Sequence, residues 1–331
     1  MNILVTGACG FIGSHLIEKL VKNGHRVSAF TFYNARGSHG WVDNIDKQIL
    51  KEIDIISGDI RDHDFLINHS KKKDAILHLA ALIGIPYSYN APKSYLDTNI
   101  TGTYNVLNAA KVNNISKTLI TSTSEVYGTA KSIPIKESHQ LSAQSPYAAS
   151  KTGADQLALS FYKSFKLPVT IIRPFNTFGP RQSTRAIIPT IITQILQNNK
   201  KIKLGNLSPT RDFTFVEDTA DSFVQALKCK NIDGEIINVG NNFEISIKEI
   251  VQIMKRDFDF DFQVTLDKKR VRGKKSEVFR LIADNTKAKK LLKWKPKYNG
   301  LKGFKLALEK TIKWFKNPKN LKDYNSQSYS I

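Results

Sequence analysis

The sequence predicts an α/β fold in which a doubly wound parallel sheet is followed by a smaller mixed α/β part. Three observations support this prediction. Short apolar runs alternate with stretches of helical period over roughly the first 175 residues. The runs are apolar almost throughout, which is typical of strands buried on both faces of a sheet. A glycine-rich turn separates the first apolar run from the first helical stretch.

The elements can be assigned in chain order. Asn2–Thr6 is a strand, the next stretch has apolar residues on one helical side, and Asn23-Gly24 ends that helix. Further strands are predicted at 26–30, 53–56, 75–79, 117–121 and 169–173, with helices between them, among them 95–111 and 146–166. After a loop over 174–182 we expect helix 186–198, strand 213–216, helix 217–228 and strand 235–238.

This order predicts two domains and a tail. Residues 1–175 would form the large sheet domain, and 176–316 would mainly form a C-terminal substrate domain. We expect the chain to cross between the two more than once. Residues 317–331 are polar and without a period, so they are predicted to be a tail.

Composition excludes several classes of protein. Hydrophobic residues make up 41% and charged residues 24%, as in folded globular chains. The longest apolar stretch, Ala75–Pro86, is too short for a spanning helix, which needs about 20 residues, and no basic leader begins the chain. Cys9 and Cys229 provide neither a disulfide framework nor a four-ligand zinc site. We therefore expect a cytoplasmic protein without a metal, bound to no membrane.

The net charge of +21 is compatible with an anionic partner. Residues 251–331 contain 22 basic and 8 acidic side chains. Nucleic acid, an anionic membrane face and a phosphorylated substrate are the candidates, against lysine used as a general surface residue. The basic part has no aromatic-interleaved stripe, so nucleic acid is not expected as a partner.

The turn Thr6-Gly-Ala-Cys-Gly-Phe-Ile-Gly13 predicts dinucleotide binding. Small residues between a strand and a helix let backbone N–H groups approach a pyrophosphate at the positive end of the helix. The strand before and the helix after the turn indicate a Rossmann-type doubly wound parallel sheet, although the spacing is GxxGxxG rather than the common GxGxxG. The expected contacts are Gly7, Gly10, Phe11, Ile12 and Gly13.

The second strand indicates where the adenosine ribose would lie. An acid usually ends this strand in NAD-binding proteins, whereas Thr31 stands there here, followed by Tyr33, Asn34 and Arg36. Arg36 could meet a ribose phosphate, so NAD and NADP both stay open. After the third strand, Asp59-Ile60 is a candidate adenine contact, and the alternative is a helix cap at Asp59 or Asp62.

Tyr147 and Lys151 are the candidate proton-transfer pair. One helical turn separates them, and a nearby ammonium together with a cationic nicotinamide would lower the pKa of the phenol. The spacing occurs at five of the eleven tyrosines, so it is not specific by itself. Tyr147 alone follows Ser145-Pro146 at a helix start, which singles out this pair.

A polar segment, Thr121–Gly128, ends the strand that begins at Lys117. Ligands of open α/β sheets lie beyond the carboxyl ends of the strands. Thr123 could therefore bind a sugar hydroxyl, and Glu125 could take a proton from a carbon next to a carbonyl group. The alternative is a Ser/Thr turn with a solvated Glu125.

With these motifs, the chain resembles the extended short-chain dehydrogenase/reductases of the NAD-dependent epimerase/dehydratase family, and within it the nucleotide-sugar 4,6-dehydratases. The resemblance covers roughly residues 1–316. Further matching motifs, in chain order, are His78-Leu-Ala-Ala81, Asn99-Ile-Thr-Gly-Thr103, Arg173-Pro-Phe-Asn176, Gly179-Pro-Arg181, Arg211-Asp-Phe213, Val216-Glu-Asp218, Asn238-Val-Gly240 and Trp294-Lys-Pro296.

The resemblance implies roles for individual residues. Leu79, Ala80, Ala81, Asn99 and Thr121 would add to the cofactor site. Dehydratases of this family have Thr-Asp-Glu or Thr-Ser-Glu where 4-epimerases usually lack the acid. Here Thr123, Ser124 and Glu125 match the second form, so Ser124 stands where the glucose-nucleotide type has an acid that protonates the leaving hydroxyl. Either Glu125 serves as both base and acid, or Ser124 relays a proton through water.

The resemblance also suggests the substrate. Ile83–Ser88 and Arg270–Leu281 are similar to the subgroup that acts on nucleotide-linked N-acetylglucosamine on the way to legionaminic- or bacillosamine-type sugars. UDP and GDP both stay open as the nucleotide. The implied substrate residues are Tyr87, Ser88, Thr123, Asn176, Arg185, Arg211, Arg270, Arg272 and Glu277, with Arg280 as a further candidate.

The implied reaction consumes no cofactor. Tyr147, helped by Thr123, takes the C4 hydroxyl proton, and hydride moves to the nicotinamide. Glu125 removes the C5 proton and water leaves from C6. The hydride then returns to C6 and a proton returns to C5. The resemblance also implies a homodimer, or a tetramer, through helices near 95–112 and 146–167. The alternatives are a nucleotide-sugar 4-epimerase and, more remotely, a non-catalytic dinucleotide sensor or nucleic-acid-binding protein.

Overall fold

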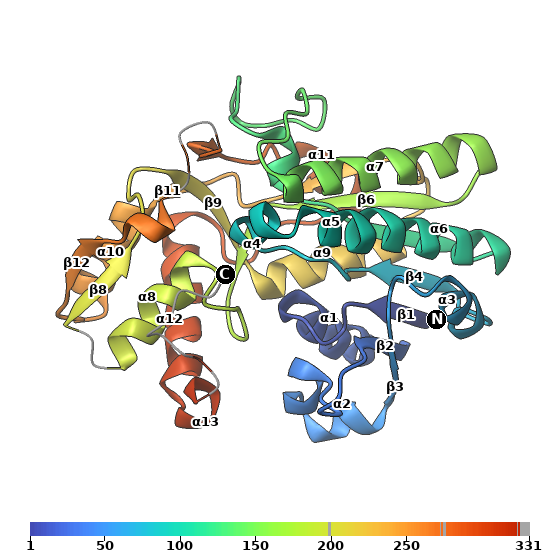
Figure 1. Cartoon of the computed structure of the whole chain (residues 1–331), viewed down its shortest axis with the longest axis horizontal. Helices are drawn as coiled ribbons and strands as arrows, with labels where there is room; N and C mark the ends of the chain where they lie inside the picture. The colour runs from blue at the N-terminus through green and yellow to red at the C-terminus, as the bar shows by residue number, and fades with distance from the viewer. Residues whose placement is uncertain (198–199, 272, 274–275, 323, 325–331) are drawn as a thin grey trace.

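The computed structural model describes residues 1–197, 200–271, 273, 276–322 and 324. Figure 1 shows two parts, with the large sheet and its helices on the right and a smaller group of helices and strands on the left. No helix in the described part of the chain combines the length and apolar character that crossing a membrane requires.

The large sheet has seven strands in the order β10-β6-β5-β4-β1-β2-β3, and every neighbouring pair is parallel. The predicted Rossmann-type fold is therefore confirmed. The strands are β1 (Asn2–Thr6), β2 (Arg26–Phe32), β3 (Ile53–Gly58), β4 (Ala75–His78), β5 (Lys117–Thr121), β6 (Val169–Pro174) and β10 (Ile236–Val239).

Helices cover both faces of this sheet because successive strand residues point to opposite sides. Ile3 and Val5 pack in one core with α1 (Phe11–Lys22), α9 (Val216–Lys228) and α11 (Thr286–Leu292). Leu4 packs in the other core, with α3 (His63–His69), α6 (Gly102–Val112) and α7 (Pro146–Phe165). The chain thus returns to the large sheet after residue 176, with α9, β10 and α11.

The smaller part has its own core, formed mainly by α8 (Ile187–Leu196), α10 (Ile247–Asp257) and α12 (Gly300–Lys316). Around β9 (Thr210–Phe215) lie β7 (Asn176–Phe178), the antiparallel β11 (Glu244–Ser246) and β13 (Arg280–Leu281). A parallel pair, β8 (Lys201–Leu204) and β12 (Gln263–Leu266), lies beside them.

The remaining elements are short. They are η1 (Gly40–Asn44), α2 (Lys47–Lys51), α4 (Ile85–Asn90), α5 (Pro92–Tyr95), η2 (Leu96–Thr101), η3 (Ser124–Tyr127), η4 (Lys268–Arg270) and α13 (Pro318–Leu321).

Two regions differ from the sequence prediction. The single helix predicted over 95–111 is α5, then a wider turn of π type, η2, and then α6. Such turns are frequent at functional sites, and this one contains Asn99. The segment from Asn317, predicted as a tail, begins with α13, and Tyr324 is buried against α12.

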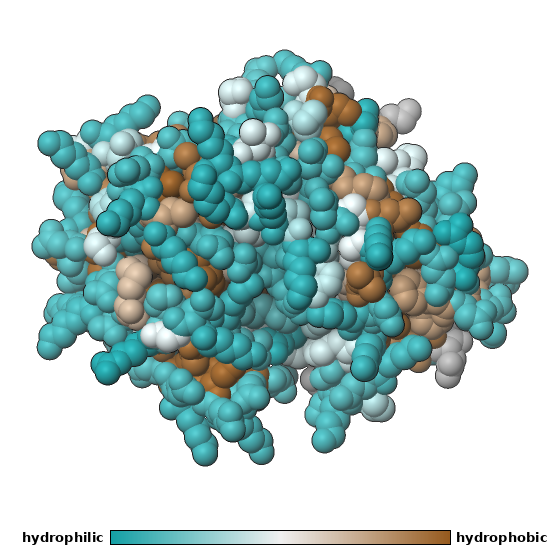
Figure 2. Space-filling model, turned by 180° about the vertical axis from the view of Figure 1, so that it is seen from behind, coloured by the Kyte–Doolittle hydropathy of each residue, from teal (hydrophilic) through white to brown (hydrophobic). Residues whose placement is uncertain are grey.

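Hydrophilic side chains cover most of the face seen in Figure 2, and the apolar ones lie in separate small patches.

Candidate active site

Tyr147 and Lys151 lie in the first two turns of α7 and are both almost fully buried. The helix begins there because the Ser145 hydroxyl accepts a hydrogen bond from the Ala148 N–H at 3.1 Å and Pro146 occupies the first helical position. The ring of Tyr147 meets Tyr95 edge to face at 6.2 Å. The N-cap and the proline thus set the residue at which α7 begins, and so place Tyr147 and Lys151 in its first two turns.

The pKa of Tyr147 is raised, contrary to the expected effect of a nearby ammonium. Burial is the largest cause, and the Glu125 carboxylate adds to it, while a hydrogen bond with Thr123 acts in the opposite direction. The protein's own groups therefore favour the neutral phenol, because an apolar surrounding penalises the charged form. The interactions of Tyr147 nevertheless place Thr123 and Glu125 beside it.

Lys151 has a pKa lowered to about 8, because burial disfavours its ammonium, and the negative charge of Asp155 opposes this effect. Asp155 is fully buried one helical turn further along α7. Its Oδ2 accepts hydrogen bonds from the Ser122 hydroxyl at 2.6 Å and from Nη2 of Arg173 at 2.8 Å. The network continues, since Arg173 Nη1 donates to the Tyr127 hydroxyl.

Sequence reasoning missed Asp155. The signal was present, because Tyr147, Lys151 and Asp155 follow one another at intervals of four residues and so share one helix face. The role of Arg173 had no local signal, since it reaches Asp155 only when α7 packs against β6.

The end of β5 brings the polar residues to the same place. Thr123 is the N-cap of η3, and its hydroxyl accepts a 3.3 Å hydrogen bond from the Glu125 N–H. Ser124 is buried, whereas Glu125 is partly exposed. The carboxylate of Glu125, rather than the Ser124 hydroxyl, is therefore the group available to a ligand.

His78, at the end of β4, is a neutral structural histidine. Thr103 donates its hydroxyl proton to the Asn99 carbonyl at 2.6 Å, so it accepts from Nε2 of His78. Nδ1 then accepts from the Thr6 hydroxyl at 2.8 Å. Burial and the charge of Lys151 lower the pKa of His78 to about 3. This network ties β1, β4 and α6 together below the site.

The glycine-rich turn fits a dinucleotide. Gly7 has φ +69°, and a Cβ there would lie 2.6 Å from the Ala80 nitrogen. A Cβ on Gly13 would lie 2.3 Å from the Gly7 carbonyl oxygen. Gly10 lies between them and donates its N–H to that oxygen. Phe11 and Ile12 begin α1 and pack against the core of the smaller part.

The segments beside this turn also fit. The Leu79 N–H donates to the Thr6 carbonyl oxygen, and the Ala80 N–H donates to the Thr6 hydroxyl oxygen. These two bonds hold the segment that leads to Ala81 next to the start of the turn. At the end of β5 the Thr121 Oγ1 is buried and has no hydrogen-bond partner among the described residues. A bound dinucleotide would give the Thr121 hydroxyl a hydrogen-bond partner. It would also lie against the backbone of the glycine-rich turn.

Asn99 has a different environment from the one expected of a cofactor contact. It is buried, and its amide bonds to both backbone groups of Leu82 and to the Ser150 hydroxyl. Since Ser150 lies between Tyr147 and Lys151, Asn99 connects the loop after β4 to the first turns of α7.

On the predicted adenosine side, Thr31 is 0% exposed, and its hydroxyl lies 3.2 Å from that of Ser57. The strand continues to Phe32, and Phe32 and Tyr33 are 59% and 70% exposed. Asn34 holds the following loop through its amide, and Arg36 is exposed on it.

Asp59 and Ile60 follow β3. The helix cap is Asp62, which accepts from the Phe65 N–H, so Asp59 is not needed as a cap. Asp59 pairs with Arg61, and this contact holds its pKa below the usual range. Ile60 is buried against Gly102.

Among the substrate candidates near Tyr147, Ser88 lies within α4. It is fully buried and donates to the Ile85 carbonyl. Tyr87 is exposed and lies 6.1 Å from the ring of Tyr95. The charge of Arg185 acts on Tyr95, which places this guanidinium near the catalytic candidates.

The other substrate candidates lie around β9. Arg211 and Glu277 are brought together, with Nη2 and Oε1 3.5 Å apart. The Oδ1 of Asn176 is buried with no hydrogen-bond partner among the residues described. Arg270 pairs with Asp267, and the exposed Arg280 pairs with Glu244. Arg272 lies outside the described residues.

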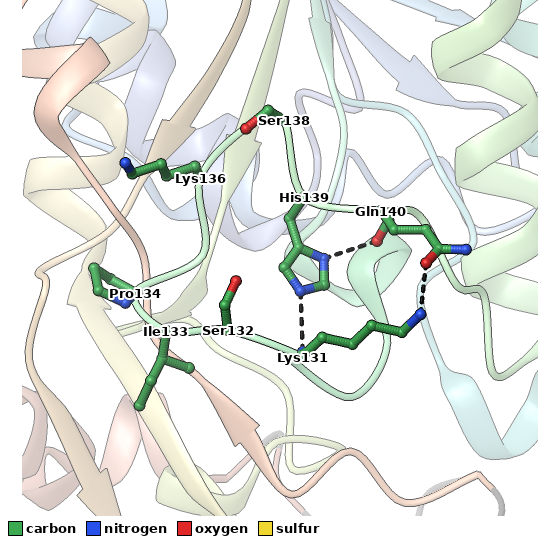
Figure 3. A pocket seen from close by; sticks show the side chains of 8 residues that line it. All are labelled: Lys131, Ser132, Ile133, Pro134, Lys136, Ser138, His139 and Gln140. Carbon is green, nitrogen blue, oxygen red and sulfur yellow. Dashed lines mark hydrogen bonds between the residues drawn. The ribbon is translucent and has the colours of Figure 1, made fainter.

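A separate hollow of about 550 Å³ lies along the loop 131–140 (Figure 3). Its wall is held by His139, which accepts from the Lys131 N–H and bonds to the Gln140 carbonyl. None of the predicted site residues lines it.

Comparison with known proteins gives one family match that covers most of the chain. The family model described as GDP-mannose 4,6 dehydratase matches residues 4–306. Human dTDP-D-glucose 4,6-dehydratase is 32% identical over 336 residues, which cover 95% of this chain and 90% of the human protein. UDP-N-acetyl-alpha-D-glucosaminuronate decarboxylase of Bacillus cytotoxicus is 32% identical over 329 residues, covering 96% and 98%.

Among solved structures, UDP-glucuronic acid 4-epimerase from Bacillus cereus, in complex with UDP-glucuronic acid and NAD, is similar with a TM-score of 0.86. The two sequences are 31% identical, and the alignment covers 96% of this chain and 99% of the epimerase. The similar proteins thus include dehydratases, epimerases and a decarboxylase of nucleotide sugars.

Proposed function

Because the chain belongs to the GDP-mannose 4,6-dehydratase family of the NAD-dependent epimerase/dehydratases, we propose that it is a nucleotide-sugar 4,6-dehydratase. Its substrate is UDP- or GDP-N-acetylglucosamine, its cofactor is NAD, and its product is the 4-keto-6-deoxy sugar. The coarser activity, chemistry on a nucleotide sugar, is common to the similar proteins of known activity.

The observation that carries the proposal is the position of Glu125. Its carboxylate acts electrostatically on the Tyr147 phenol, and Thr123 bonds to that same phenol. A 4-epimerase needs only the tyrosine and a hydrogen-bonding neighbour at C4. A dehydratase also needs a base for the C5 proton, and Glu125 supplies a carboxylate next to the group that faces C4.

The roles of the chain's own residues follow from this arrangement. Tyr147 takes the proton of the C4 hydroxyl, and Thr123 binds that oxygen. NAD, which the glycine-rich turn would hold, would supply the hydride acceptor for C4 and the hydride donor for C6. Lys151, one helical turn further along α7, brings its amino group to the same site. Glu125 removes the C5 proton, which is acidified by the C4 ketone, as the C6 hydroxyl leaves.

Glu125 also protonates the leaving C6 hydroxyl. Ser124 stands where the glucose-nucleotide dehydratases have an acid, and its burial supports giving both proton transfers to one carboxylate. The proton that Glu125 takes from C5 passes to the oxygen on the neighbouring C6, which leaves as water. After the hydride has returned to C6, C5 takes a proton from solvent through Glu125, and this balances the C4 hydroxyl proton that Tyr147 releases.

The nucleotide diphosphate is bound by arginines of the smaller part. Arg211 is half of a buried pair with Glu277, and Arg185 lies near Tyr95. A guanidinium fork matches phosphate oxygens, which supports both residues as contacts. We further propose a homodimer, supported by exposed apolar residues on the outer sides of η2, α6 and α7: Leu96, Tyr104, Val112, Tyr162 and Phe165.

A nucleotide-sugar 4-epimerase is the second candidate, and the similarity to the Bacillus cereus epimerase favours it. The two reactions differ in mass balance. Incubation of the protein with UDP- and GDP-N-acetylglucosamine, followed by mass spectrometry, should show loss of one water from one of the two sugars. An isomer of unchanged mass would establish the epimerase instead.

A further inference from the structure

The loop after β2 lies directly on the glycine-rich turn. Trp41 donates its N–H to the Cys9 carbonyl oxygen at 3.1 Å, and Cys9 is in the middle of that turn. Gly40 has φ +59°, and a Cβ there would lie 2.8 Å from the same oxygen. The loop is therefore in close backbone contact with the segment proposed to hold the pyrophosphate.

Side chains within the loop keep it in one conformation. The Asn34 amide oxygen accepts from the N–H groups of Arg36 and Ser38, at 3.1 and 3.3 Å. The Asp43 carboxylate accepts from the His39 N–H at 2.8 Å. These hydrogen bonds connect the parts of loop 33–44, so a displacement of Trp41 would also displace the exposed residues at the end of β2.

The Trp41 side chain is held by the far end of the chain. Its ring packs edge to face on Trp314 of α12 at 5.6 Å and is stacked with Tyr324 at 6.1 Å. Tyr324 in turn packs on Phe315 at 5.0 Å. We call Trp314, Phe315 and Tyr324 the C-terminal clasp.

The clasp joins the two parts of the molecule at the cofactor side. In Figure 1 the red helices α12 and α13 belong to the left-hand part, while the blue α1 and β2 belong to the right-hand part. Phe11 and Ile12, the first residues of α1, pack against the same core as the clasp. The smaller part therefore contacts both the loop and the first turn of the helix that follows the glycine-rich turn.

We propose that the C-terminal clasp holds the loop 33–44 over the glycine-rich turn and so retains the bound dinucleotide. Trp41 and Trp314 are positioning residues in this role. The inference rests on the proposed function in one respect, namely that the chain binds NAD. Retention suits a reaction in which the cofactor is regenerated at every turnover, since release would only interrupt it.

The test is the rate at which the purified holoprotein loses NAD after free NAD is removed, together with the Kd for NAD by equilibrium dialysis. Trp41→Ala and Trp314→Ala should each speed NAD loss about tenfold or more, because each removes aromatic contacts that hold the loop closed. Trp41→Phe keeps an aromatic ring and should restore most of the retention. Leu306→Ala, on the outer side of α12, is the matched control and should leave NAD loss unchanged.

Thermal unfolding of every variant distinguishes loss of retention from loss of fold. If Trp314→Ala does not fold, Trp41→Ala still decides, since Trp41 is on a surface loop and is only partly buried. Wild-type rates of NAD loss in folded Trp41→Ala would overturn the inference. Absence of NAD binding by the wild type would instead overturn the proposed function.

Discussion

At the scale of single residues, burial determines the chemistry of the candidate site. Tyr147 and Lys151 share one helix face, and burial pushes both toward their neutral forms. The compensating charges come from outside that pair. Asp155 opposes the effect on Lys151, and Arg173 with Ser122 holds Asp155 in place. The pair is therefore one part of a charged network that extends across β5 and β6.

This network predicts a pH dependence. Lys151 has a pKa of about 8, so it loses its proton, and activity should fall, as the pH rises through that value. Asp155 raises the pKa of Lys151, so Asp155→Asn should move the alkaline limb of the kcat profile to lower pH. Asp155→Glu keeps the charge and should shift the limb less. A limb that stays in place in folded Asp155→Asn would show that Asp155 does not govern Lys151.

Glu125 and Ser124 give a second prediction. Glu125→Gln should lower the rate of 4-keto-6-deoxy product formation by at least about 100-fold, because the amide cannot accept the C5 proton. The variant should still bind NAD. Ser124→Ala should lose far less, since the hydroxyl is buried. Product formation by Glu125→Gln at near wild-type rate would remove Glu125 from the mechanism.

At the scale of elements, the strands of the large sheet could be predicted from their apolar runs, and most long helices from their helical period. The short helices could not. The side chains of Thr31 and Ser88 are buried, and the sequence alone does not say which side of a strand end or of a two-turn helix is exposed. The wider turn η2 has no sequence period that distinguishes it from the helices on either side.

The glycine-rich turn predicts an effect that is specific to cofactor binding. Gly13→Ala places a methyl group 2.3 Å from the Gly7 carbonyl oxygen, so the turn must shift and NAD affinity should fall at least about tenfold. Gly24→Ala is the control: its φ is +76°, but a Cβ there meets nothing within 4 Å. It should cost about 1 kcal/mol of folding stability and leave NAD binding intact. Equal NAD affinity in both variants would contradict the role of the turn.

At the scale of the whole molecule, the site is assembled by chain crossings. Tyr147, Lys151, Thr123 and the glycines could be predicted because each lies within one short motif. Arg173 meets Asp155 only when α7 packs against β6, and Arg211 meets Glu277 from a distant part of the chain. The contact of Trp41 with Trp314 joins residues from opposite ends of the chain, and no local pattern indicates it.

The central claim is that C4 oxidation by this protein leads to loss of the C6 hydroxyl. Proton NMR of the wild-type protein with UDP- and GDP-N-acetylglucosamine, each alone in heavy water, tests it most directly. We predict a new 6-methyl signal, with deuterium at C5, from one of the two sugars. A C4 epimer that keeps its C5 hydrogen and its C6 hydroxymethyl group would contradict the account.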